Sequence, residues 1–194
     1  MYDTLLSYIE KHSTTPLSAS DIELIQSKFA PKKLRKGQYL LQEGEICRST
    51  AFIVNGAMRQ YSVDDKGMEH IIQLAIENWW ALDRESFLTL APSRFNIDAW
   101  EDTNLLILAK TDYYDHLIHV PAMVEMLATM KDNHAYATQK RLHSALNDTA
   151  EQRYFNFQKT YPELIQRFPQ YLIASYLGVA KETLSRLRSY PVQK

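Results

Sequence analysis

The sequence predicts an α+β fold in which an antiparallel β-roll is followed by a long helix and a C-terminal helical domain. Between residues 33 and 108, short runs rich in Val, Ile, Phe and Tyr alternate with glycine turns. Apolar residues recur at helical spacing from Val120 to Leu146, and Phe168 to Arg188 contains two short amphipathic helices joined at Gly178. A chain of 194 residues that is 45% hydrophobic can bury one good core and a smaller second one, so we expect two domains.

Two helices are predicted ahead of the sheet, at residues 3–12 and from Ser18 to Phe29. Ser18 or Ser20 would cap the second helix, and Pro31 would stop it. The first helix is amphipathic and carries acids, which argues against a signal peptide. Because no run of 18 or more residues is apolar, we expect a soluble, cytoplasmic protein without a membrane partner.

The strands are predicted from an alternating pattern that begins at Lys33. Leu34, Tyr39 and Leu41 are expected to face one side of strands broken at Gly37 and Gly44. Evenly spaced short antiparallel strands are typical of a sandwich or barrel. The remaining features are turns at Asn55-Gly56 and Lys66-Gly67, a looser segment from Asn78 to Pro92, and strands from Asn96 to Trp100 and Asn104 to Leu108.

The long helix from Val120 to Leu146 opens with Pro121 at a first-turn position. Its apolar stripe is too long for a small sheet to cover, which favours pairing with a second copy. Methionine-rich stripes are more often plain core than interface, and the residues alone leave both interpretations open. The stripe consists of Val120, Met123, Met126 or Leu127, Met130, Ala137, Leu142 and Ala145.

The C-terminal part is predicted to be helical. We expect a hinge at Asn147-Asp148. A helix from Thr149 to Lys159 should follow and end at Tyr161-Pro162. A short helical turn should then begin at Pro162. The pair of helices around Gly178 then indicates a helix-turn-helix, because glycine can adopt the left-handed conformation that closes the first helix. Ala174 is small enough to let the second helix approach.

The second helix of this pair has a polar outer face that suits DNA. Arginine can bond guanine O6 and N7 together, glutamate can accept from the cytosine amino group, and lysine suits phosphates. The alternative is an ordinary helical hairpin with a solvated charged face. The predicted inward residues are Val179, Thr183, Leu184 and Leu187, and the predicted DNA-binding residues are Lys181, Glu182, Thr183, Ser185, Arg186 and Arg188.

The segment from Ile173 to Arg188, IASYLGVAKETLSRLR, resembles the recognition segment of the cAMP receptor protein/FNR (Crp/Fnr) family of transcription regulators. The resemblance implies that Glu182 and Arg186 read bases, with Lys181 at a position where arginine is commoner. It also implies dimerisation along the long helix, double-stranded DNA as a ligand and RNA polymerase as a partner.

The predicted sheet resembles the cyclic-nucleotide-binding jelly roll of the same family, at Glu43-Gly44-Glu45, Phe52 to Gly56 and Asp64 to Glu69. Together the resemblances imply three parts: a cyclic-nucleotide-binding-like β-roll with N-terminal helices at residues 1–119, a dimerisation helix at 120–146, and a helix-turn-helix domain at 147–194. Relatives usually continue into a β-hairpin wing. Only six residues follow Arg188, so we expect the wing to be short or missing, naturally or by truncation.

Members of this family that bind cAMP hold its phosphate with a Gly-Glu pair and an Arg-Ser pair. The corresponding region, from Ala81 to Phe95, has no Gly-Glu, and Ser93-Arg94 reverses the second pair, so we do not expect cAMP control. No cofactor is predicted and the effector is left unnamed. Candidates for another anion are Arg84, Glu85, Ser93 and Arg94, and the tryptophans Trp79, Trp80 and Trp100 are expected to pack in the core or between domains rather than stack on a ligand.

Composition narrows the function further. The formal charge is −1, divided into +3 from Asn147 onward and −4 in the remainder, a weak polarity in favour of DNA binding. Cys47 is the only cysteine, which excludes an intramolecular disulfide and a multi-cysteine iron–sulfur site. The six histidines lack metal-ligand spacing, and no nucleophile motif or phosphate-binding loop occurs, so neither a metal site nor an enzyme is expected.

The alternative to a regulator is a small-molecule or nucleotide sensor whose helix-turn-helix no longer reads specific DNA.

Overall fold

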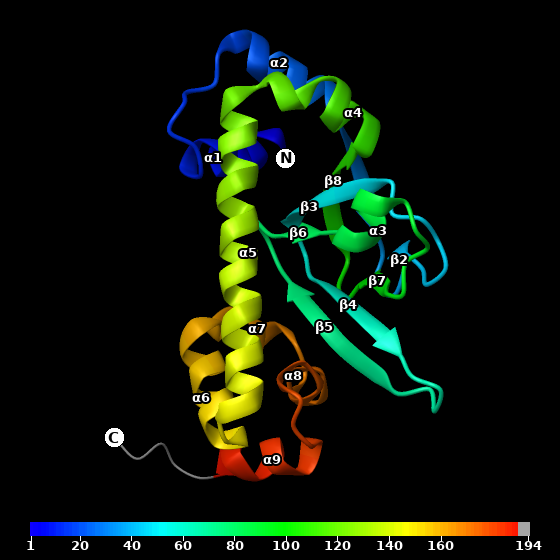
Figure 1. The fold of residues 1–194 in the computed structure, drawn as a ribbon, viewed down its shortest axis with the longest axis vertical. Coiled ribbons are helices and arrows are strands. Elements are labelled where there is room, and N and C mark those ends of the chain that lie inside the picture. The colour runs from blue at the N-terminus through cyan, green and yellow to red at the C-terminus, as the bar shows by residue number, and fades with distance from the viewer. Residues whose placement is uncertain (190–194) are drawn as a thin grey trace.

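The computed structural model describes residues 1–189, with side chains as far as Arg186. A long helix, α5, runs along one side of the molecule; the N-terminal helices cross its upper end, and the C-terminal helices gather at its lower end (Figure 1). The helices are α1 (Tyr2–Lys11), α2 (Ala19–Lys28), α3 (Arg84–Thr89), α4 (Lys110–Asp115), a 3-10 turn at Leu117–His119, α5 (Pro121–Asn147), α6 (Ala150–Thr160), α7 (Pro162–Arg167), α8 (Gln170–Leu177) and α9 (Lys181–Ser189).

Within the described residues the strands form two four-stranded antiparallel sheets, ordered β1-β8-β3-β6 and β2-β7-β4-β5. The predicted α+β fold with an N-terminal β-roll is therefore confirmed. The strands are β1 (Phe29–Leu34), β2 (Tyr39–Leu41), β3 (Ser49–Asn55), β4 (Met58–Val63), β5 (Glu69–Ala75), β6 (Trp80–Ala81), β7 (Asn96–Ala99) and β8 (Thr103–Ala109).

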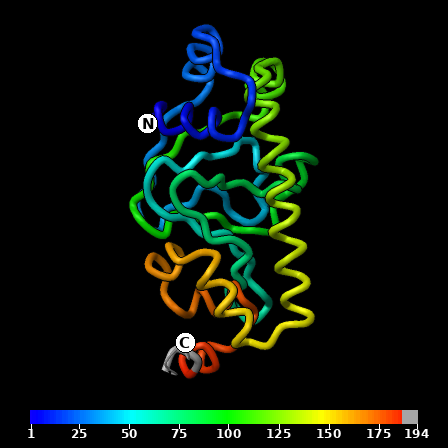
Figure 2. Tube along the Cα trace, turned by 90° about the vertical axis from the view of Figure 1, so that its left-hand side faces the viewer, coloured from blue at the N-terminus to red at the C-terminus, as the bar shows by residue number. Residues whose placement is uncertain are grey.

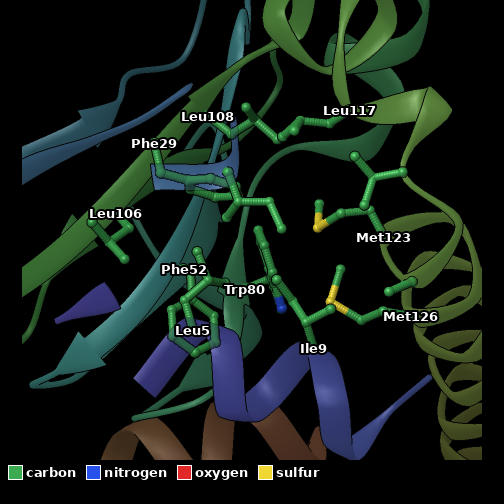
Figure 3. Close-up of a cluster of buried hydrophobic side chains, with 13 residues drawn as sticks. Leu5, Ile9, Phe29, Phe52, Trp80, Leu106, Leu108, Leu117, Met123 and Met126 are labelled. Carbon is green, nitrogen blue, oxygen red and sulfur yellow. The ribbon is translucent and has the colours of Figure 1, made fainter. Parts of the chain in front are cut away.

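Successive residues of a β-strand point to opposite faces of the sheet, so neighbouring side chains belong to different hydrophobic cores. Ile53 and Leu105 point between the two sheets, whereas their neighbours Phe52 and Leu106 point outward to the helices. The outer face of the first sheet packs against α1 and the first turns of α5, where Met123 and other side chains from these elements converge (Figure 3). This core fixes the upper half of α5 to the β-roll.

The stripe predicted on α5 divides in two. Its first members, Val120, Met123 and Met126, are at most 2% exposed because they complete the core under α1, so their assignment to a dimer interface is wrong. Further along the helix, Leu142 and Leu146 are 60% and 76% exposed. Within the described chain the core therefore covers one side of the first turns of α5, while Val124, which is 42% exposed, and the later Leu142 and Leu146 stay outside it.

Several local predictions differ from the structure. Pro31 does not end the second helix; it lies within β1, which is an edge strand and therefore tolerates a residue without an N–H group. Tyr39 is 43% exposed, while Leu34 and Leu41 are buried, so the three do not share a face. The segment from Asn78 to Pro92 is not loose, because it contains β6 and α3.

Gly56 closes the β3–β4 turn at a φ of 109°. A Cβ at this position would lie 2.7 Å from Thr103 Cα and 2.8 Å from the Asp102 carbonyl oxygen, so β8 and the turn could not keep their present approach.

We expect Gly56→Ala to lower the free energy of unfolding by about 2 kcal/mol or more, because backbone strain and overpacking act together. Urea unfolding followed by circular dichroism measures the change. Gly67→Ala is the matched control: Gly67 has a φ of 79° but no atom within 4 Å of an added Cβ, so only backbone strain should be felt. Equal losses in the two variants would contradict the steric explanation.

The C-terminal helices pack directly on the outer face of the second sheet. Leu74 and Ile71 from β5 share a core with Ile173 and Leu172 from α8, and all four are at most 2% exposed. Trp100 contacts Phe168 at 6.2 Å between ring centroids, so it forms part of a contact between the sheet and these helices, as predicted for the tryptophans. The other buried members of this core are Ala57, Tyr61, Tyr154, Phe157, Leu164, Phe168, Ala174 and Leu184.

An ion-pair cluster borders this contact. Arg167 on α7 binds Glu101 through two hydrogen bonds of 2.9 and 2.7 Å and Glu77 through two of 3.1 and 3.2 Å. Glu77 also accepts a 2.8 Å bond from the Gly56 amide. Burial alone would raise the pKa of Glu77, but the bonds from Arg167 and Gly56 outweigh it and hold the pKa below the ordinary value of 4.5.

A carboxylate whose pKa is lowered by folding stabilises the fold above its unfolded pKa and loses that contribution as the pH falls through its folded pKa. We therefore expect the contact between the sheet and the C-terminal helices to weaken as the pH falls below about 4.5. Arg167→Gln should cost about 1 kcal/mol at pH 7, since the cluster is partly exposed, and should shift the onset of the acid transition to higher pH. Fluorescence of Trp79 and Trp100 during acid titration measures this transition. Identical transitions in the wild type and in Arg167→Gln would contradict the role given to Arg167.

Candidate functional site

The pair of helices predicted around Gly178 is present. Gly178 has φ 63° and ψ 40°, the left-handed conformation expected at the end of α8, and the Val179 amide donates to the Ala174 carbonyl at 3.0 Å. Ala174 is 2% exposed at the crossing, so its small side chain permits the close approach that was predicted. The turn therefore fixes the direction in which α9 leaves α8.

α9 has one buried and one exposed face. Leu184 is fully buried against the C-terminal core, and Thr183 is half-buried. Glu182 and Arg186 are both exposed, and their spacing of four residues places them on one face of the helix. Lys181 and Ser185 are exposed as well, whereas the predicted contact Arg188 and the inward residue Leu187 lie outside the described side chains.

α9 lies at the end of the molecule farthest from the N-terminal helices (Figures 1 and 2). It packs on α6 and α8. Its charged face can therefore meet a large ligand approaching from the lower end.

The segment that corresponds to a phosphate-binding loop is closed by its own side chains. Asp83 is the N-cap of α3 and accepts bonds from the amides of Glu85 and Ser86 at 3.0 and 3.3 Å. The Ser93 hydroxyl donates to the other Asp83 oxygen at 2.7 Å. Both side chains are buried. The amides and the hydroxyl that could donate hydrogen bonds to an anion here already donate to Asp83.

Of the four residues predicted as a ligand site, only Arg94 and Glu85 bind each other. Ser93 points into the segment, but Arg84 is exposed, and Arg94 forms an exposed ion pair with Glu85 at 2.9 Å. The Ser93 hydroxyl instead bonds Asp83 and the backbone of Phe95, while the Arg94 guanidinium is turned to Glu85. These residues do not fit the phosphate of a cyclic nucleotide, and the carboxylate of Asp83 would repel it.

We expect cAMP not to bind this protein at concentrations up to about 1 mM. A dissociation constant above that value corresponds to a binding free energy weaker than roughly −4 kcal/mol. Isothermal titration calorimetry with the full chain measures this. Micromolar binding, together with a cAMP-dependent gain in DNA affinity, would contradict the role given to the bond between Asp83 and Ser93.

A hollow of about 470 Å³ lies beside this segment, lined by residues 40, 41 and 45–49 together with Leu82 and Ile97. Its size is within the range that holds small molecules. Cys47 at its wall is buried, and burial raises the pKa of its thiol, so the sulfur is not a reactive thiolate. No sequence pattern predicted this hollow, because its walls come from separate segments of the chain: β2, residues 45–48, the start of β3, Leu82 and β7.

The uncovered face of α5 carries small and apolar side chains. At 100° per residue, five exposed positions fall within one sector about 40° wide along the helix, and the exposed Lys131 lies about 20° outside it. The five positions are Val124, Ala128, Ala135, Leu142 and Leu146. In both views this helix has a side that no other described segment covers (Figures 1 and 2).

The described residues contain no group of three His, Cys, Asp or Glu side chains placed to hold a metal ion. No helix among residues 1–189 is both long and apolar enough to span a bilayer.

Residues 31–118 match the cyclic nucleotide-binding domain family, and these residues form most of the β-roll. No curated protein sequence was found to match the chain.

Solved structures with the same fold include several regulators. A crp/fnr-family protein from Eubacterium rectale is 17% identical, with 88% of this chain and 82% of that chain covered and a TM-score of 0.65. FixK2 from Bradyrhizobium japonicum is 19% identical, with 83% of each chain covered and a TM-score of 0.67. The c-di-GMP responsive global regulator CLP from Xanthomonas campestris is 10% identical, with 88% and 89% covered and a TM-score of 0.69. Residues 31–118 thus match the cyclic nucleotide-binding domain, and the chain shares the fold of these crp/fnr-type structures.

Proposed function

We propose that this protein is a dimeric, sequence-specific DNA-binding transcription regulator of the Crp/Fnr type that is not controlled by cAMP. The observation that carries the proposal is α9, whose Leu184 is fully buried while Lys181, Glu182 and Arg186 are exposed on the outside of a helix pair closed by a left-handed glycine. This arrangement suits a helix that enters the major groove with its N-terminal residues against base edges.

The proposed base readers are Glu182 and Arg186, with Lys181 at phosphates and Thr183 and Ser185 beside them. Arg188 is proposed as a further phosphate contact on the sequence pattern alone. Because arginine binds guanine through two parallel bonds and lysine cannot, the specificity of the site should depend mainly on Arg186.

The proposed dimer forms along the exposed stripe of α5 from Val124 to Leu146. Pairing there would place the two copies of α9 about a twofold axis, so the operator should be an inverted repeat. The division into a β-roll at residues 1–119, a dimer helix at 120–146 and a DNA-binding part at 147–194 belongs to the same proposal, as does RNA polymerase as a partner of the DNA-bound dimer.

The proposal is tested by mobility shift with genomic fragments, with and without candidate nucleotides, in the presence of excess random competitor DNA. Retention of a small subset of fragments by the unliganded protein is the expected result. Uniform binding of all fragments, lost in parallel as salt rises, would show that the charged helix binds backbone only.

The hollow of about 470 Å³ supports a second candidate function, a small-molecule sensor whose helix pair no longer reads specific DNA. A small effector that binds the protein while no DNA fragment is preferred would favour this second function.

A further inference from the structure

One side chain connects the long helix, the sheet and the end of α8. Arg141, on α5, donates to the carbonyl oxygens of Ile72 at 2.6 Å, Ile71 at 3.2 Å and Tyr176 at 2.8 Å. Its guanidinium also lies over the Tyr176 ring, 4.1 Å from the centroid. The first two carbonyls belong to β5 and the third to the last turn of α8, immediately before the turn into α9.

The carbonyl of Ile72 is available because β5 is irregular. β5 is the edge strand of its sheet, and its register with β4 shifts where Ile71 pairs with Tyr61 and Gln73 pairs with Gln60, so Ile72 is left without a partner residue. A free strand edge would normally expose such groups to water or to another strand. Here side chains bind them instead. Ser175 of α8 completes the connection by accepting from the Ile71 amide at 3.0 Å and donating to the Glu69 carbonyl at 3.1 Å.

The end of α8 is held by two arginines with different anchors. Arg153, on α6, donates to the carbonyls of Leu177 at 2.8 Å and Gly178 at 3.3 Å, which connects α8 only to its own helical bundle. Arg141 binds the preceding carbonyl from α5, across the hinge predicted at Asn147-Asp148. Terminal carbonyls of a helix have no intrahelical partner, and cations stabilise them.

We propose that Arg141 is a positioning residue that fixes α8 and α9 relative to α5, and so sets the separation of the two reading helices in the dimer. The inference rests on the proposed function, because a separation has meaning only where two copies of α9 meet one duplex. α5 carries the proposed dimer contact, and Arg141 lies one residue from Leu142 in that stripe. Because this side chain joins α5 to the last turn before α9, it fixes the position of α9 relative to the proposed twofold axis of the dimer.

Arg141→Lys keeps the charge but replaces a planar fork with a single ammonium group, which cannot hold three carbonyls in the same way. We expect the base preference within one half-site to stay unchanged, since α9 itself is intact. Affinity for the best operator should fall about tenfold, because the loosened helices must be ordered on binding. Operators with spacers one or two base pairs longer or shorter should lose less affinity in the variant than in the wild type.

Two variants serve as controls. Lys140→Gln removes a neighbouring exposed charge of α5, and Arg153→Lys makes the same exchange at the arginine that holds α8 within its own bundle. Neither should broaden the tolerated spacing, although Arg153→Lys should lower affinity at every spacing. A second readout needs no DNA: hydrogen exchange in residues 69–76 and 170–186 should become faster in Arg141→Lys and stay unchanged in Lys140→Gln.

The experiment measures binding of each full-length protein to duplexes with one half-site and with two half-sites at five spacings, alongside hydrogen exchange. Broadened spacing with unchanged base preference and faster exchange is the expected result. An equal loss at all spacings, or exchange that matches the wild type, would overturn the role of Arg141. If the wild type prefers no DNA sequence, the proposed function fails, while exchange still decides whether Arg141 holds α8 and α9 against β5.

Discussion

Leu142→Glu is expected to convert the dimer into a 22.6 kDa monomer and to weaken binding to an inverted repeat on the order of 100-fold. Leu142 is 60% exposed in the single chain, so the substitution creates no cavity in the protomer. In a dimer formed along α5, two glutamates would face each other across an apolar contact, and their repulsion and desolvation would oppose association. Light scattering at micromolar concentration, together with DNA titration, measures both effects.

Lys140→Glu is the matched control. It introduces the same side chain two residues away, about 200° around the helix from Leu142, at a position that is also exposed. This variant should remain dimeric. A Leu142→Glu protein that stays dimeric while circular dichroism shows it folded would place the interface elsewhere, and a wild-type protein that is only monomeric would remove the interface altogether.

Arg186→Ala is expected to cost about 1–3 kcal/mol at the specific site, or about 5- to 150-fold in affinity, because a bidentate guanine contact is worth about that much. Its side chain is exposed on α9, so stability should change little. Base preference should be lost at one position of each half-site. Binding to duplexes randomised at each half-site position, measured at two salt concentrations, detects this.

Two other substitutions separate base reading from backbone binding. Glu182→Ala removes an acceptor near phosphates, so non-specific affinity should rise while discrimination at the paired cytosine falls. Lys181→Ala should weaken binding to all sequences alike and reduce the salt dependence by about one unit of slope. If Arg186→Ala leaves base preference unchanged, α9 is an ordinary solvated helix and not the reading element.

The strands and the helix pair were predictable because their signals are local. Alternation of apolar residues located most of the strands, and the glycine at position 178 with Ala174 four residues earlier located the turn and the helix crossing. Ser18 was one of two serines expected to cap the second helix, and its hydroxyl accepts from the Asp21 amide at 3.2 Å. Each of these patterns depends on neighbours within one or two turns of chain.

The features that sequence reasoning missed depend on tertiary contacts. The apolar stripe of α5 was predicted as one surface, but α1 and the first sheet cover its beginning, so the exposed stripe starts at Val124, which was not predicted, and continues to Leu142, which was. Asp83 was not among the candidate residues because its partner, Ser93, is ten residues away across α3. The contacts of Arg141 with β5 and α8 join residues 35 to 70 positions apart, and no local pattern predicts them.

Selection of bound sequences from a pool of randomised duplexes tests the central claim most directly. A dimer that presents two copies of α9 should enrich an inverted repeat whose half-site centres lie about 34 Å apart, one turn of B-DNA, with a guanine at a fixed position in each half. Enrichment of a single unrepeated site would contradict the dimer, and failure to enrich any sequence would contradict specific DNA binding by this protein.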